Sequence, residues 1–115
     1  MPRLEVRKYL YDIQQACQKI QNFTRECSLA DYEANEMLRS AVERQLEVVG
    51  EALNRLLRMK PDLEASISQA RRVIGLRNRL IHGYADIAND IVWAIAETDL
   101  PALQNEISLL LASPE

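Results

Sequence analysis

The chain has 115 residues, 48% of them hydrophobic, with a net charge of −3 and only three glycines and four prolines. This composition predicts one domain, residues 1–115, rich in regular structure, and excludes a disordered or fibrous protein. Because no apolar run approaches the ~18 residues of a membrane span and the N-terminus is charged, we expect a cytoplasmic protein without a membrane partner.

Two helices are predicted in the first half of the chain. The first apolar stripe at helical spacing covers about residues 4–26. Ser28 and Asp31 then form an S-x-x-D start signal, and the next stripe stops before Pro61. We therefore expect a second, long helix over about residues 32–59.

Three shorter helices are predicted in the second half. Asp62 is a candidate N-cap for a third helix, which Gly83 stops after about residue 82. Asn89 can cap a fourth helix, and Asp99 before Leu-Pro is a start signal for the last. With no period-two pattern, the expected fold is an all-α up-and-down bundle of four to five helices. The alternative is an open helical pair that completes its core only by dimerising.

Arg44, Gly50 and Glu51 interrupt the apolar pattern of the second helix. Arg44 and Glu51 are seven residues apart and share a face, and a glycine inside a helix costs ~1 kcal/mol against alanine. One interpretation is a solvated charged face with a neutral glycine. The other is that Gly50 lets another helix approach closely while Arg44 or Glu51 forms a specific ion pair.

The third helix carries a second internal glycine, Gly75, which close packing of another helix or backbone would explain. Apolar residues stand on several of its sides, among them Val73, Ile74, Leu80 and Ile81. This pattern predicts a helix that is buried nearly all round, and one bundle cannot easily cover every side of it. A second subunit is therefore expected.

Cysteine and histidine are too scarce for a metal site. The chain has two cysteines, Cys17 and Cys27, without a CxxC pair, and one histidine, His82. We expect two free thiols and no zinc.

The segment RNRLIHGY, residues 77–84, contains that histidine. Residues 71–84 carry four arginines and no acid, a basic patch that suits a phosphate ligand or an acidic partner. Asn78 and Arg79 share a side of the helix with His82, while Arg77 lies about 140° round the helix axis. The plain interpretation is a structural histidine near a helix C-terminus.

The chemical interpretation is cleavage of RNA. A histidine can take the proton of a ribose 2′-OH, which then attacks the neighbouring phosphate, and an arginine can stabilise the charge that develops. The leaving 5′-oxygen also needs an acid. One histidine per chain does not fill both roles, but a symmetric dimer supplies a second.

RNRLIHGY resembles the R-x4-H-x-Y motif of the HepT-like proteins, a branch of the HEPN superfamily. Two further blocks resemble family signatures in order and spacing. They are AVERQLEVVGEAL, residues 41–53, with Arg44, Glu47, Gly50 and Glu51 at the matching places, and DIVWAIAETDLPAL, residues 90–103. The resemblance covers nearly the whole chain.

The resemblance implies a helical homodimer that acts as a metal-independent ribonuclease toxin on tRNA or mRNA. Arg77 and His82 would be catalytic at the dimer interface, with Asn78 supporting them. The implied partner is a minimal nucleotidyltransferase antitoxin that transfers AMP from ATP onto the motif tyrosine, here Tyr84. That bulky anion would compete with RNA for Arg77. No cofactor and no DNA partner are expected.

Some positions stay open or depart from the family. Arg79 is open between a phosphate contact, an interface ion pair and a solvated charge. Gln69-Ala70 stands where many members have Pro-Trp, which would alter only the start of the third helix. Ala88 stands where many have an acid, so no acidic contact is carried over there.

A different class of function is also compatible with the sequence. It is a catalytically inactive helical dimer that binds a nucleotide or docks a nucleotidyltransferase. The negative net charge favours this alternative, since RNA affinity usually rests on neutralised phosphates.

Overall fold

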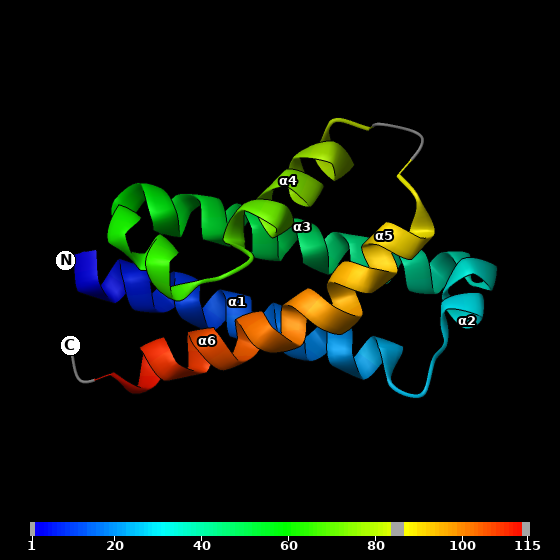
Figure 1. The fold of residues 1–115 in the computed structure, drawn as a ribbon, viewed down its shortest axis with the longest axis horizontal. Coiled ribbons are helices and arrows are strands. Elements are labelled where there is room, and N and C mark those ends of the chain that lie inside the picture. Colours follow the sequence, from blue (N-terminus) through cyan, green and yellow to red (C-terminus); the bar gives the residue numbers. More distant parts are fainter. Residues whose placement is uncertain (1, 84–86, 114–115) are drawn as a thin grey trace.

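The computed structural model describes residues 2–83 and 87–113 (Figure 1). Within these ranges every regular element is a helix, which confirms the all-α class. The elements are α1 (Pro2–Thr24), α2 (Leu29–Ala34), α3 (Glu36–Met59), the 3-10 helix η1 (Pro61–Ser66), α4 (Ala70–Ile81), α5 (Asn89–Ala94), the π-helical turn η2 (Ile95–Asp99) and α6 (Leu100–Ala112).

The long helices form an up-and-down arrangement. Figure 1 shows α3 and α6 running antiparallel to α1, with α4 lying obliquely on α3. At 1.5 Å per residue the 24 residues of α3 span about 36 Å, most of the 44 Å length of the molecule. The helices of one chain therefore enclose a core, as expected of a bundle and not of an open helical pair.

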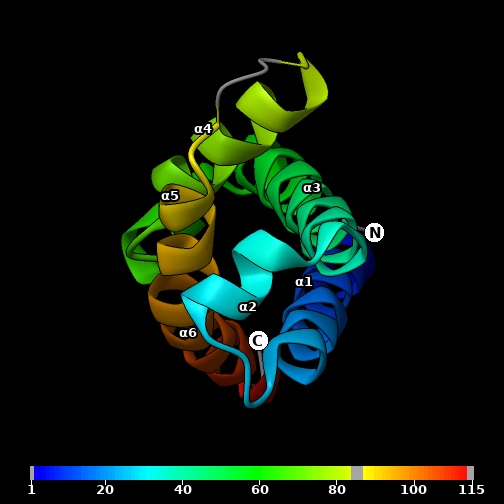
Figure 2. The same ribbon diagram turned by 90° about the vertical axis from the view of Figure 1, so that its right-hand side faces the viewer.

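The second predicted helix is in fact two helices. Ser28 and Asp31 do form a capping box, but it starts the short α2. Asn35 ends α2 in an extended conformation and then caps α3 by accepting from the backbone N–H of Leu38 at 3.0 Å. Figure 2 shows α2 at one end of the bundle, where Tyr32 packs on Trp93 of α5 with 5.4 Å between ring centroids.

The third predicted helix begins later than expected. Asp62 does not cap it, since Lys60 precedes η1 and Asp62 lies within η1. After η1 the chain leaves helical geometry at Ile67, and α4 begins at Ala70 after Gln69, which makes no side-chain cap. Pro61 ended α3 as predicted, but a proline-led 3-10 turn took the place of the first helical turns.

The last two predicted helices form one continuous helical run. Ala88, not Asn89, is the N-cap of α5, and it makes no side-chain cap. Asp99 keeps helical φ and ψ angles and also forms no side-chain cap. The π-helical turn η2 joins α5 to α6, so Asp99 is free for another contact.

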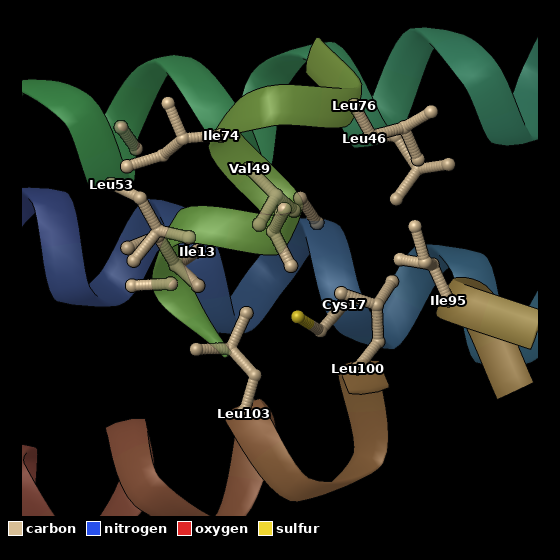
Figure 3. Close-up of a cluster of buried hydrophobic side chains, with 14 of the residues drawn as sticks. Ile13, Cys17, Leu46, Val49, Leu53, Ile74, Leu76, Ile95, Leu100 and Leu103 are labelled. Carbon is tan, nitrogen blue, oxygen red and sulfur yellow. The ribbon is translucent and has the colours of Figure 1, made fainter. Parts of the chain in front are cut away.

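The core is apolar and draws on α1, α3, α4 and the α5–α6 run (Figure 3). Ile13 and Cys17 of α1 meet Leu46, Val49 and Leu53 of α3, Ile74 and Leu76 of α4, and Ile95, Leu100 and Leu103. Both cysteines are free thiols, and burial raises the pKa of the Cys17 thiol to about 12. Cys17 is thus an inert packing residue.

Candidate functional site on α4

Four of the residues singled out in the sequence, Gly50, Glu51, Arg77 and Asn78, come together where α4 lies on α3. The apolar residues of α4 face the bundle, with Ala70, Val73, Ile74 and Leu76 buried. Its C-terminal end projects from the bundle (Figures 1 and 2). The polar residues Asn78, Arg79 and His82 are exposed at that end, while Arg77 stays partly buried against α3.

Gly50 is the point of closest approach between α3 and α4. A Cβ at this position would overlap the Cβ of Arg77 and lie 2.7 Å from its Cγ. Only glycine leaves room there for the root of the arginine side chain. The interpretation of Gly50 as a site of close helix approach is therefore confirmed, and the residue it admits is Arg77.

Arg77 is held in place by polar contacts on two sides. Its Nη2 donates to the Glu51 carboxylate of α3, and its Nη1 donates to Asn78 Oδ1 at 2.9 Å. The side chain is only 18% exposed, and its Nε is buried without a hydrogen-bond partner among the described residues. A guanidinium fixed in this way keeps its planar fork in one orientation, which suits binding of a phosphate.

Glu51 joins this arginine to a second one. Its other oxygen accepts from Arg55 Nε at 2.6 Å, and the carboxylate is 37% exposed. The hydrogen bond from Arg55, with the charge of Arg77, lowers the pKa of Glu51. Glu51 therefore forms the specific ion pair, while Arg44 makes only a 3.4 Å contact with Glu47 on its own helix.

His82 is the C-cap of α4 and is exposed. Its backbone N–H donates to Asn78 O at 3.2 Å, and Gly83 follows with a φ of +69°. Gly83 thus ends the helix as predicted, because a left-handed conformation favours glycine. Tyr84 lies outside the described residues.

Three further predictions for α4 concern Arg79, Gly75 and the burial of the whole helix. Arg79 is exposed and pairs with no other described residue. The prediction of close packing at Gly75 is wrong within this chain, since a Cβ there would meet open space. The prediction that the helix is buried nearly all round is also wrong within this chain, because Arg71, Gly75 and Arg79 are exposed and Ile81 is 45% exposed.

An ion pair that the sequence did not reveal ties α4 to the C-terminal helices. Arg72 Nε lies 2.9 Å from Asp99 Oδ2, although the N–H is not aligned for a hydrogen bond. The Asp99 side chain is only 8% exposed, and its burial raises its pKa while Arg72 opposes the shift. In the sequence, Asp99 before Leu-Pro is a helix-start signal, which gives no indication that Asp99 pairs with Arg72.

The described ranges hold neither a metal-binding cluster nor a membrane-spanning helix. No group of three or more His, Cys, Asp or Glu side chains there is arranged to hold a metal ion. None of the helices described is long and apolar enough to cross a membrane.

The described fold and the placement of these residues agree with a family of helical proteins. The family described as Ribonuclease HepT-like, part of the HEPN superfamily, matches residues 13–110. The chain therefore belongs to the HepT-like family, which confirms the resemblance drawn from the three sequence blocks.

Individual relatives match over nearly their whole length. A Methanocaldococcus jannaschii protein named as a putative RNase is 32% identical over 96% of this chain and 100% of its own. A Thermococcus cleftensis protein named probable ribonuclease HepT is 31% identical over 90% of this chain and 94% of its own. No solved structure matches the chain significantly.

Proposed function

We propose that this protein is a ribonuclease that cleaves RNA through Arg77 and His82 without a metal ion. Membership of the HepT-like family and the names of its relatives support a ribonuclease role. The observation that carries the assignment of residues is the fixed guanidinium of Arg77, held by Gly50, Glu51 and Asn78, on the helix that ends at the exposed His82.

The proposed reaction is an internal transesterification. His82 takes the proton of a ribose 2′-OH, and the 2′-oxygen attacks the adjacent phosphorus. The bond from phosphorus to the 5′-oxygen breaks, and that oxygen receives a proton from an imidazolium. Arg77 stabilises the additional negative charge on the phosphate. The products are a 2′,3′-cyclic phosphate and a free 5′-OH.

A second copy of the chain would supply the acid. Each chain has one histidine, so base and acid come from the two copies of a homodimer. The uncovered side of α4, with open space at Gly75 and an exposed Ile81, supports a contact there. Light scattering should show a dimer at micromolar concentration, and a monomer that cleaves RNA would exclude the shared site.

We further propose that the protein is the toxin of a toxin–antitoxin pair. The partner would be a minimal nucleotidyltransferase that transfers AMP from ATP onto Tyr84, two residues after His82. With partner and ATP, the intact mass should rise by one or more AMP units, and Tyr84→Phe should abolish the rise. Labelling that survives this substitution would refute the tyrosine assignment.

The nuclease proposal is tested by incubating tRNA and mRNA with the purified protein in the presence of a chelator. His82→Ala and Arg77→Ala should each lower the cleavage rate by about 10²- to 10⁴-fold. Since His82 is exposed, its substitution should leave the melting temperature nearly unchanged. Equal activity in the wild type and both variants would reject the proposal.

The alternative is a catalytically inactive helical dimer that docks a nucleotidyltransferase or binds a nucleotide. Besides the negative net charge of the chain, one structural observation favours it. Glu51 already pairs with Arg77 and partly neutralises the charge that RNA would need. In this case the wild type would leave RNA intact with or without chelator, yet would still be labelled by the partner.

A further inference from the structure

Beyond α4, the surface carries a groove between α1 and α3 that passes Glu51. Two adjoining hollows of about 340 Å³ and 300 Å³ make up this groove. Both are lined by Asp12, Arg44 and Val48, so they lie end to end along the two helices. Glu51 and Arg55 line the first hollow, and Glu51 also holds Arg77. The groove thus leads away from the proposed site.

The acids of this groove are each paired with a cation that stands further out. Asp12 pairs with Lys8, Glu47 with Arg44, and Glu51 with Arg55. The three acidic side chains are 28–37% exposed, whereas the three cationic ones are 58–71% exposed. A ligand that approaches the groove therefore meets guanidinium and ammonium groups before it meets carboxylates.

Further positive charge reaches the same surface. Lys19 lines the second hollow, and the charge of Arg58 contributes to the lowered pKa of Glu51. The groove itself is lined by three acids (Asp12, Glu47 and Glu51) and three cations (Lys19, Arg44 and Arg55), and Lys8 and Arg77, which pair with two of these acids, bring the cations to five. The chain as a whole has a net charge of −3. Such a local excess points to an anionic ligand that lies along the groove.

The groove also offers an aromatic side chain. Tyr9 lines the first hollow, and its phenol group interacts with Arg55. An aromatic ring beside a row of cations is the arrangement that binds single-stranded nucleic acid, because bases stack on the ring while phosphates meet the cations. From Arg44 to Arg55 the groove extends about 16 Å along α3, enough for a few nucleotides.

We propose that the α1–α3 groove binds single-stranded RNA and directs a flanking phosphate toward Arg77 and His82. This inference rests on the proposed ribonuclease function for its purpose, but the binding itself does not require cleavage. The groove would bind through charge and stacking, so it would select for single strands and not for a base sequence.

The test compares two double substitutions that remove the same charge. Lys19→Gln with Arg44→Gln lies in the groove and away from Arg77. Arg25→Gln with Lys60→Gln is the matched control, because it also removes one arginine and one lysine, and neither residue lines the groove. Each pair is made in a His82→Ala background, and binding of a short fluorescent single-stranded RNA is measured over a range of salt concentrations.

The variant with both Lys19→Gln and Arg44→Gln, called the groove double below, should bind RNA roughly tenfold more weakly. It should also lower the slope of log Kd against log salt by about 1.4, because each of the two lost phosphate contacts contributes ~0.7. The control should change affinity less than twofold. Tyr9→Leu should weaken binding about tenfold while Tyr9→Phe does not, since only the former removes the stacking ring. Unchanged affinity in the groove double would overturn the inference.

Cleavage assays separate this inference from the proposed function. With His82 intact, the groove double should raise KM and leave kcat unchanged. If the wild type cleaves RNA and the groove double has an unaltered KM, the groove assignment is wrong and the nuclease stands. If neither the wild type nor the variants cleave RNA, but the groove double binds RNA more weakly than the control, the groove assignment holds without the nuclease function. A groove double that becomes monomeric would assign the groove to a contact between copies and overturn the inference.

Discussion

Two arginines on α4, five residues apart, pair with acids in opposite ways. At Arg72 the acid is buried: Asp99 is 8% exposed and Arg72 is 51% exposed. At Arg77 the cation is the more buried group: it is 18% exposed and Glu51 is 37% exposed. The first pair joins α4 to the C-terminal helices. The second fixes a guanidinium close to the exposed end of the helix, an arrangement that suits phosphate binding.

The largest difference between the two arginines should appear in activity when each becomes lysine. Arg77→Lys keeps the charge but loses the fork that contacts Glu51 and Asn78, so we expect RNA cleavage to fall by about 10²-fold or more. Arg72→Lys should retain most activity, because Arg72 contacts Asp99 and not the site. Cleavage rates of the two purified variants test this. Equal losses would show that both arginines merely hold the fold.

The second comparison concerns two glycines. Gly50 faces Arg77 across the contact between α3 and α4, and Gly75 lies between Arg72 and Arg77 on α4. Gly50→Ala forces Arg77 away from α3, and we expect a loss of about 1–3 kcal/mol in the free energy of unfolding, together with weaker cleavage. Gly75→Ala has open space and removes a helix-interior glycine, so it should stabilise by up to ~1 kcal/mol. Urea denaturation measures both. A Gly50→Ala protein as stable as the wild type would contradict the close approach.

The Arg72–Asp99 pair should respond unequally to the loss of each partner. Arg72→Gln leaves the Asp99 carboxylate buried without its cation, and we expect a loss of about 1–2 kcal/mol, reduced because Arg72 is half exposed. Asp99→Asn removes the buried charge itself and should cost less. Because the folded pKa of Asp99 is raised, the Arg72→Gln protein should regain stability as the pH falls. Thermal melts at several pH values test this order.

The smallest effect concerns Glu51 and has the opposite pH dependence. Its pKa is lowered by Arg55 and Arg77, so its contribution is present above the ordinary pKa of 4.5 and is lost as the pH falls through the lower folded value. Glu51→Gln should therefore be less stable than the wild type by under ~1 kcal/mol at neutral pH. The difference should vanish in acid, and a constant difference would refute this.

Much of the fold could be predicted because its signals are local. Helical periodicity, the stop at Pro61 and the stop at Gly83 each depend on neighbouring residues. The boundaries at Asn35 and Ala70 could not be predicted, because Asn35 both ends one helix and caps the next. At the start of α4 a 3-10 turn competes with α-helix for the same residues.

In the candidate site, too, the residues with local sequence signals could be predicted, and their contacts across helices could not. The motif residues Arg77 and His82 were read from the sequence, and Gly50 with Glu51 were correctly suspected of a close approach and an ion pair. Their partner was not predictable, since Glu51 and Arg77 are 26 residues apart and meet only when α4 lies on α3. Asp99 was misread for the same reason: its partner, Arg72, lies on another helix.

The most direct test of the central claim is the product of RNA cleavage in the presence of a chelator. Wild-type protein should convert RNA to fragments that end in a 2′,3′-cyclic phosphate and begin with a 5′-OH. His82→Ala protein, purified in the same way and equally stable, should yield these fragments at a rate lower by about 10²-fold or more. Intact RNA with the wild type, or the same fragments from His82→Ala, would contradict the account.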